Sequence, residues 1–324
     1  MKKLLCGLIC AAFLSAAASA MASSPDTYLP DLEGIYWQSA PVTASGEEGV
    51  TYNSELGTLI PLENDNTLSL SPTLLPEPIP APQKAEMAPL EKPMIAIVID
   101  DMGVDRKHSA RAVKNLPAAV TTSYLAYSAH IQEQVDAAHK AGHEVILHLP
   151  WEPDRSTADP GPNHMSVSMT KEQLQKNLLA NLDGFKGYVG VNNHMGSKFS
   201  QYRPGVEIVM AELKKRGVFF LDSKTTPFSI AEKTAREYGV PTTHRDVFID
   251  DQEIPVFLTA MLKNVEAVAR KKGSAVAIGH PKDMTLAALE AWIPMIQKKG
   301  FRLVPLSTVL KYRQSADAGY VANK

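Results

Sequence analysis

Two adjacent carboxylates, Asp100 and Asp101, follow a short run of apolar residues from Ile95 to Ile99. The run is typical of a buried strand, and in α/β barrels the catalytic residues gather at the carboxyl ends of the strands. Neighbouring strand residues point to opposite faces, so the chain must turn after Ile99 if both carboxylates are to share one site. One would then bind a metal ion while the other moves protons. The alternative is that one Asp only caps the following helix.

Two later strand ends carry residues that suit a metal ion. His148 stands at the end of the third apolar run, and Glu152 follows four residues later. Imidazole and carboxylate groups are good ligands for zinc and similar ions, although a histidine at a strand end is often only hydrogen-bonded. The next strand ends in a polar cluster that contains Asn193, His194 and Ser197. Turns rarely need so many polar side chains, so the cluster indicates a site.

The later strand ends carry further polar side chains. These residues are Asp222, Lys224, Asp246, Asp250 and His280. Each of them alone is compatible with a turn or a helix cap. Because the carboxyl ends of parallel strands meet at one edge of a sheet, we expect these side chains to converge on one rim, as active-site residues do.

Short β-branched segments alternate with longer amphipathic segments after residue 93, which is typical of repeated βα units. Strands are expected at residues 95–99, 120–125, 144–148, 188–191, 218–221, 242–244, 275–278 and 302–304. Helices are expected between them, for example at residues 171–182, 206–216, 230–238 and 256–272. This order predicts an α/β fold, a (β/α) barrel or near-barrel of seven or eight strands. An open doubly wound sheet is the alternative, but no glycine-rich phosphate loop follows any of the strands.

The chain resembles the polysaccharide deacetylases, metal-dependent carbohydrate esterases with a distorted β/α barrel, and is most similar to their divergent bacterial branch. Residues 99–103, Ile-Asp-Asp-Met-Gly, resemble the first motif of the family. The resemblance implies that Asp100 is the catalytic base and that Asp101 binds the metal ion. Residues 278–280, Ile-Gly-His, are similar to the last motif, which implies that His280 is the general acid.

The second motif departs from the family pattern. That motif normally supplies two histidine ligands four residues apart, whereas this chain has His148 followed by Glu152. Either Glu152 replaces the missing imidazole or His194 supplies it from the next strand. We favour His194, because the string over residues 191–197 is characteristic of the divergent branch. The arginine-proline and aspartate-tryptophan motifs of the family are not recognisable. Candidates for their roles are Asp222, Lys224, Arg245 and Asp246.

The resemblance implies a hydrolase that removes N- or O-acetyl groups from an envelope or extracellular polysaccharide, such as peptidoglycan or another N-acetylated glycan. A divalent ion, zinc, held by Asp101, His148 and His194 would activate a water molecule and polarise the acetyl carbonyl. Asp100 would accept the proton of that water, and His280 would protonate the leaving group. Residues expected to contact the substrate or support the ligands are Glu152, Asn193, Ser197, Asp222, Lys224, Asp246 and Asp250.

Two other functions remain open at this point. A catalytically impaired barrel would bind glycan or regulate a cell-wall enzyme, and the loss of the paired-histidine motif favours it. A different metallohydrolase would use the same scaffold. The joint presence of Asp100, Asp101, His148 and His280 favours catalysis, because a binding module needs no acid and base beside its ligands.

The ends of the chain differ in composition from the barrel. Two lysines precede an apolar stretch and a small-x-small cleavage site, which predicts a signal peptide at residues 1–20. Residues 21–92 are rich in proline and lack periodicity, which predicts an extended tether. In the alternative in which the barrel regulates a cell-wall enzyme, this tether would make the contact. The barrel is expected at residues 93–312 and a flexible tail at residues 313–324. The formal net charge of -2 and the lack of a basic run argue against a nucleic-acid partner.

Export of the chain is the first testable prediction. Cleavage of the signal peptide would leave a mature chain that begins near Met21, in the periplasm or outside the cell. N-terminal sequencing or the intact mass of periplasmic material measures this directly. A chain that keeps Met1 would contradict cleavage and favour an uncleaved anchor, although the apolar stretch is shorter than the roughly 20 residues that span a bilayer.

Overall fold

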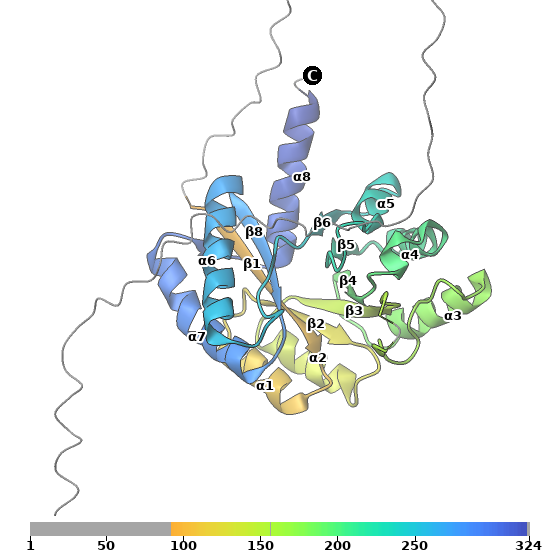
Figure 1. The fold of residues 1–324 in the computed structure, drawn as a ribbon, viewed down its shortest axis with the longest axis horizontal. Helices are drawn as coiled ribbons and strands as arrows, with labels where there is room; N and C mark the ends of the chain where they lie inside the picture. The colour runs from red at the N-terminus through yellow and green to blue at the C-terminus, as the bar shows by residue number, and fades with distance from the viewer. Residues whose placement is uncertain (1–91, 156, 323–324) are drawn as a thin grey trace, which may run out of the picture. The chain divides into compact units, whose positions relative to one another are not determined.

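The computed structural model describes residues 92–155 and 157–322 (Figure 1). The predicted signal peptide and nearly all of the predicted tether lie outside these residues. The strands are β1 (Met94–Met102), β2 (Thr121–Leu125), β3 (Val145–Trp151), β4 (Gly190–Met195), β5 (Phe219–Asp222), β6 (Thr242–His244), β7 (Val247–Phe248), β8 (Ser274–Gly279) and β9 (Arg302–Leu303). The helices are α1 (Arg106–Asn115), α2 (Ile131–Lys140), α3 (Lys171–Leu182), α4 (Arg203–Arg216), α5 (Ala231–Glu237), α6 (Pro255–Lys272), α7 (Asp283–Lys298) and α8 (Leu306–Ala322), with a 3-10 turn, η1, at Phe199–Gln201. No helix among the described residues is long and apolar enough to cross a membrane.

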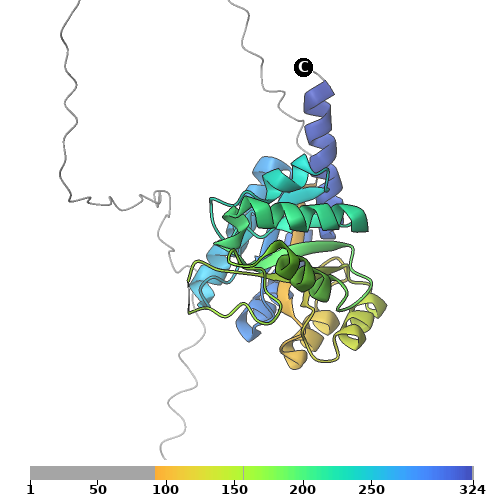
Figure 2. The same ribbon diagram turned by 90° about the vertical axis from the view of Figure 1, so that its right-hand side faces the viewer.

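The strands of the described chain form one sheet, in the order β6-β5-β4-β3-β2-β1-β8-β7, with β9 beside the start of β1. Every pairing between them is parallel. Strands β6 and β7 end the order on opposite sides, yet only Arg245 and Asp246 separate them in the chain. The sheet must therefore curl until its two edges approach each other, and helices α1 to α7 surround it (Figure 1 and Figure 2). The prediction of an α/β fold built as a distorted barrel is confirmed.

Strand β1 is buried on both faces, as its unbroken apolar run predicts. Ile97 and its outward-facing neighbours pack in the larger hydrophobic cluster, together with residues of the surrounding helices. Ala96 and Val98 point to the inside of the curled sheet and belong to a second, smaller cluster. Leu306 and Val309 of α8 join that second cluster. Helix α8 therefore fills the end of the interior at which the strands begin.

Polar residues occupy the other end of the interior, where the strands finish. Side chains alternate between the two faces of a strand, so Asp100 continues the inward row of β1 that Ala96 and Val98 begin. By the same alternation, His148 continues the inward row of β3 and His280 that of β8. The interior thus has an apolar half, which α8 seals, and a polar layer at the carboxyl ends of the strands.

Most predicted elements coincide with observed ones. The helix predicted at residues 171–182 is α3, and every predicted strand overlaps a strand of the sheet. Strand β7 escapes sequence analysis because its two residues, Val247 and Phe248, are too few to show a period. The sheet therefore has nine strands rather than seven or eight.

The flexible tail predicted from residue 313 begins instead as an ordered part of α8. Arg313 donates hydrogen bonds to Thr243 Oγ1 of β6 at 3.0 Å and to Ser274 Oγ of β8 at 3.1 Å. It also forms an ion pair with Asp246, whose side chain is 2% exposed. Asp246 also forms an ion pair with Lys272, whose Nζ lies 2.9 Å from Asp246 Oδ1. Asp246 thus joins the two edges of the sheet together with Arg313, and it also lines a cleft at the carboxyl ends of the strands, so its expected place near a substrate stays a prediction.

Replacement of Arg313 by Ala tests this closure. Removing one partner of a buried ion pair costs about 3–5 kcal/mol, and because Lys272 remains beside Asp246 we expect the low end of that range. Burial raises the pKa of Asp246, but Arg313 outweighs it and holds this pKa below its usual value. A carboxyl with a depressed pKa stabilises the fold above its ordinary pKa of about 3.9 and loses that contribution as the pH falls.

Urea unfolding of wild type and Arg313→Ala at neutral pH and at about pH 3 measures both effects. The difference in unfolding free energy between wild type and Arg313→Ala should be smaller at low pH. Lys311→Ala, an exposed change on the same helix, is the control and should resemble wild type. An equal difference in unfolding free energy at both pH values would contradict stabilisation by the Arg313–Asp246 ion pair.

Candidate metal centre

The backbone turns at Asp101, so that both carboxylates of β1 reach one site. Asp101 has a φ angle of 55°, in the left-handed region, and the pairing of β1 with β2 shifts register between Ile99 and Met102. Asp is one of the few residues with a side chain that adopt this conformation readily. The turn that the sequence analysis requires after Ile99 is therefore present.

Asp101, His148 and His194 each place one ligand atom within 4.8 Å of the others. Asp101 Oδ1 lies 2.9 Å from His194 Nδ1 and 3.3 Å from His148 Nε2. The two ring nitrogens lie 3.2 Å apart. Asp101 Oδ1 is buried, yet it accepts no hydrogen bond from the described residues. A buried oxygen without a donor, facing two imidazole nitrogens, fits a divalent ion that keeps further coordination positions open.

The charges of the cluster also suit a cation. Burial raises the pKa of Asp101, but the imidazoles of His148 and His194 outweigh it and hold this pKa well below its usual range. Burial lowers the pKa of His148, but Asp100 and Asp101 raise it on balance. The carboxylates therefore attract positive charge, either as protons on the imidazoles or as a metal ion. Because imidazole binds a metal only when that nitrogen is free of its proton, the two compete.

Glu152 lies outside the cluster. Its Oε1 pairs with Lys198 Nζ at 2.6 Å, and its Oε2 accepts hydrogen bonds from Ser166 Oγ at 2.6 Å and from a backbone N–H. These contacts join the loop after β3 to the loop after β4. Of the two alternatives that the sequence leaves open, the geometry brings His194 rather than Glu152 to Asp101.

Asp100 and His280 flank the cluster. Asp100 is 2% exposed, and its Oδ2 lies 3.6 Å from His148 Nε2. His280 Nε2 lies 3.7 Å from Asp101 Oδ2, while its Nδ1 lies 3.0 Å from Asp250 Oδ1. Burial lowers the pKa of His280, but the hydrogen bond to Asp250 and the charges of nearby aspartates raise it to about 9. Asp250 thus orients His280 and favours its protonated form.

The cluster opens into a cleft of ≈ 980 Å³ at the carboxyl ends of the strands. This volume is in the range of clefts that hold small-molecule ligands. The lining includes the apolar side chains of Phe248, Phe257 and Met261 and the cationic side chains of Arg155 and Lys224. Such a mixed surface suits a ligand that offers both apolar faces and hydroxyl groups.

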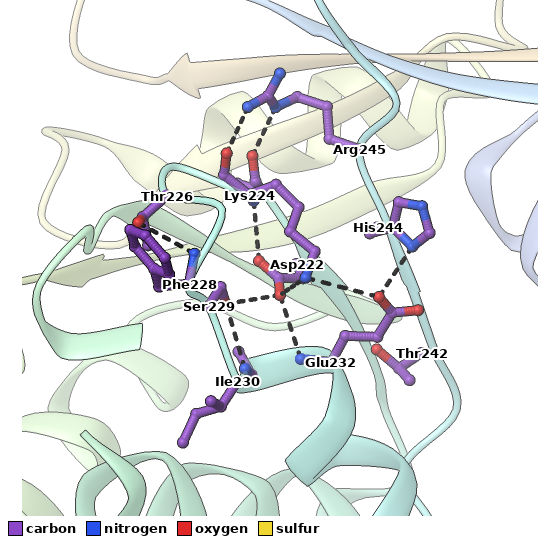
Figure 3. A network of polar contacts seen from close by, with 12 residues as sticks. Asp222, Lys224, Thr226, Phe228, Ser229, Ile230, Glu232, Thr242, His244 and Arg245 are labelled. Carbon is purple, nitrogen blue, oxygen red and sulfur yellow. Dashed lines mark hydrogen bonds and ion pairs between the residues drawn. The ribbon is translucent and has the colours of Figure 1, made fainter. Parts of the chain in front are cut away.

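Asp222 and Lys224 belong to a network beside the cleft (Figure 3). Asp222 is fully buried and accepts hydrogen bonds from Ser229 Oγ at 2.8 Å and from the backbone N–H of Glu232 at 3.2 Å. Lys224 Nζ lies 3.2 Å from Asp222 Oδ2. Arg245 donates to two carbonyl oxygens of the same loop, including that of Lys224 at 2.6 Å. Asp222 therefore orders the loop after β5, whereas Lys224 also lines the cleft.

Asn193 and Ser197 line the cleft while holding the loop after β4. Asn193 Oδ1 accepts from the backbone N–H of Ser223 at 2.9 Å, and its Nδ2 donates to Met195 O at 2.7 Å. Ser197 Oγ accepts from the backbone N–H of Asp154 at 2.8 Å. Their predicted roles toward a substrate stay predictions.

Sequence reasoning missed several polar residues that support the cluster. Asn192 and Ser123 point inward beside His148, and Thr285 donates to Asp250 Oδ2 at 2.8 Å. The signal that would have found Asn192 is its period of two with His194 along β4. A buried amide on the same face as a metal ligand has to bind other polar side chains.

Comparisons with known proteins identify a family and a related fold. Residues 97–310 match a family described as divergent polysaccharide deacetylase. The uncharacterized protein YibQ of Escherichia coli (strain K12) is 34% identical over 199 residues, which cover 61% of this chain and 62% of the relative. An uncharacterized protein of Haemophilus influenzae is 32% identical over 61% of this chain and 70% of its own length. The crystal structure of an uncharacterized protein of Agrobacterium tumefaciens C58 superimposes with a TM-score of 0.66 and 26% identity, covering 68% of this chain and 91% of that one.

Metal content tests the cluster. We expect about one zinc ion per chain in wild type, and loss of the ion in His148→Ala and His194→Ala, because each variant removes one of the three ligands that the described residues offer. Elemental analysis of the purified proteins measures this. Glu152→Gln is the matched control and should keep its zinc. Full occupancy in His194→Ala together with loss in Glu152→Gln would transfer the ligand role to Glu152.

Proposed function

Because this chain belongs to the divergent polysaccharide deacetylase family, we propose that it is a metal-dependent hydrolase that removes acetyl groups from a polysaccharide. The observation that carries the proposal is the cluster of Asp101, His148 and His194, with Asp100 and His280 on its two flanks. Ligands, a base and an acid meet at the carboxyl ends of the strands, where barrel enzymes have their active sites.

Asp101, His148 and His194 would hold the ion in this proposal. Zinc bound there supplies a Lewis acid that lowers the pKa of water and polarises the acetyl carbonyl. With three protein ligands, such a site would leave a coordination position for water or substrate, as in other catalytic zinc sites. The buried oxygen of Asp101 that lacks a hydrogen-bond donor among the described residues supports this assignment.

Asp100 would act as the general base. Its carboxylate lies beside His148 and receives hydrogen bonds from Asn192 Nδ2 at 2.9 and 3.0 Å, which fix its plane. A fixed carboxylate next to the metal ligands is placed to accept a proton from the attacking water. Burial of Asp100 in the polar layer limits the access of other water molecules.

His280 would act as the general acid. Asp250 occupies the Nδ1 side of the ring, so Nε2 is the nitrogen that faces the cluster, 3.7 Å from Asp101 Oδ2. Despite burial, the hydrogen bond to Asp250 and the charges of nearby aspartates raise the pKa of His280 to about 9, which favours the protonated form that a general acid needs. Transfer of the Nε2 proton to the departing nitrogen or oxygen completes hydrolysis of the acetyl group.

We propose an N-acetylated envelope glycan, such as peptidoglycan, as the substrate. The cleft volume of ≈ 980 Å³ has room for sugar rings, and its apolar lining by Phe248 and Phe257 suits their C–H faces. The predicted signal peptide supports a site of action in the periplasm or outside the cell. Contact of the proline-rich tether with a cell-wall enzyme stays a prediction.

The alternative of an impaired, glycan-binding barrel rests on the missing second histidine of the family motif. His194 places an imidazole nitrogen 2.9 Å from Asp101 Oδ1, so a second imidazole stands beside this carboxylate although the paired-histidine motif is lost. The position of His194 supports the hypothesis of a catalytic metal site over that of a catalytically impaired barrel.

Acetate release from N-acetylated peptidoglycan fragments and chitin-type oligomers tests the proposal. After loading with zinc, Asp100→Asn and His280→Gln should keep fold and metal but lose about a hundredfold to ten-thousandfold in rate, because each lacks a positioned proton-transfer group. Asp136→Asn and His139→Gln, exposed changes of the same kind on α2, are the matched controls.

Two outcomes would count against the proposal. If zinc-loaded wild type releases no acetate from any glycan of a broad panel, the protein is better described as a glycan-binding or regulatory barrel. Equal activity in wild type, Asp100→Asn and His280→Gln would show that other residues transfer the protons.

A further inference from the structure

Asn192 connects the polar layer inside the curled sheet. It is fully buried on β4, in register with His148 on β3. Its Oδ1 accepts a hydrogen bond from Ser123 Oγ at 2.6 Å and faces His148 Nδ1 at 2.9 Å. Its Nδ2 donates to both oxygens of Asp100, at 2.9 and 3.0 Å, and to Ser223 Oγ at 3.1 Å. One amide thus joins side chains from four different strands or strand ends.

The carboxylate of Asp100 decides which way this amide points. A carboxylate only accepts hydrogen bonds, so the donor Nδ2 of Asn192 must face Asp100 and the acceptor Oδ1 must face His148. An acceptor at that place requires the proton of a neutral His148 to sit on Nδ1. Nε2 is then free of a proton, and Nε2 is the nitrogen that faces Asp101.

Without this amide, the Nε2-protonated tautomer of His148 would become more populated. Carboxylate oxygens of Asp101 and Asp100 lie 3.3 and 3.6 Å from Nε2, so a proton on Nε2 would find a charged acceptor. Such a proton would occupy the lone pair that a metal ion needs. Asn192 Oδ1, the acceptor beside Nδ1, favours the tautomer with its proton on Nδ1.

We propose that Asn192 is a positioning residue that keeps His148 in the Nδ1-protonated tautomer and fixes Asp100 at the same time. The inference deepens the proposed function and rests on it for the roles of base and metal ligand. A single amide thereby sets the relative placement of the two groups. If the amide of Asn192 rotates or is lost, His148 and Asp100 both lose their hydrogen-bond partner.

Other buried amides of the chain serve a different purpose. Asn181 is 1% exposed and donates to the carbonyl oxygens of Asn163 and Asn177, both at 2.9 Å. Asn193 likewise bonds to backbone groups. Asn192 instead bonds to four polar side chains, two of them in the proposed reaction site. Replacement of Asn181 therefore provides a matched control for the loss of a buried amide.

The test uses nitrogen NMR of the histidine rings and zinc affinity, neither of which depends on acetate release. In the metal-free protein, at a pH where His148 is neutral, we expect its proton on Nδ1 in wild type and in Asn181→Leu. Asn192→Leu should shift the proton toward Nε2. Its affinity for zinc, measured by competition with a chelator, should fall about 10- to 100-fold, the usual cost of removing a partner of a ligating histidine.

Asn192→Asp separates the two halves of the proposal and keeps the shape of the side chain. It retains an acceptor for His148 but places a second carboxylate against Asp100, so the tautomer should stay while acetate release falls. A proton on Nε2 in wild type, or unchanged tautomer and zinc affinity in Asn192→Leu, would overturn the proposal. If wild type shows the expected tautomer and zinc affinity but releases no acetate, the proposed function fails and the role of Asn192 stands.

Discussion

The rest of the structure depends on one constraint, which is that polar groups inside the curled sheet must find their hydrogen-bond partners among one another. The inward rows of β1, β3 and β8 are apolar at their start and polar at their end, and the polar end borders the cleft. Asp100, His148 and Asn192 therefore satisfy each other. In such surroundings charges interact strongly, which is why the pKa of Asp101 and the pKa of His148 move in opposite directions.

Left-handed backbone conformations recur around the candidate site, and other side chains hold them in place. Asp101, Met195 and Lys224 follow or end three strands with φ angles of 55°, 52° and 49°. Such conformations are unfavourable for residues with a Cβ and persist where neighbours enforce them. Asn193 donates to the carbonyl oxygen of Met195, and Arg245 donates to that of Lys224. Two residues that show no catalytic chemistry of their own thus shape the mouth of the cleft.

Local patterns in the sequence predict much of this protein, and long-range contacts account for what they miss. The apolar run before Asp100 predicts β1, and the capping box of Thr170 and Gln173 marks the start of α3, because these signals lie within a few residues. The alternation along β4 places Asn192 on the same face as His194, but it cannot show which side chains the buried amide will bond to, since those partners come from strands far away in the chain. Arg313 likewise looks like an ordinary charged residue of a terminal helix until the sheet brings β6 and β8 around it.

The position of α8 determines when the barrel is complete during folding. The backbone N–H of Leu306 donates to Thr121 Oγ1 across 185 residues of sequence, and Glu144 accepts from Ser307 at the same helix terminus. Contacts between such distant segments form late and slow the folding of a domain. The apolar half of the interior therefore stays accessible to water until α8, near the end of the described chain, packs against it. Because α8 closes the barrel, the apolar half of its interior is complete only after this helix has docked.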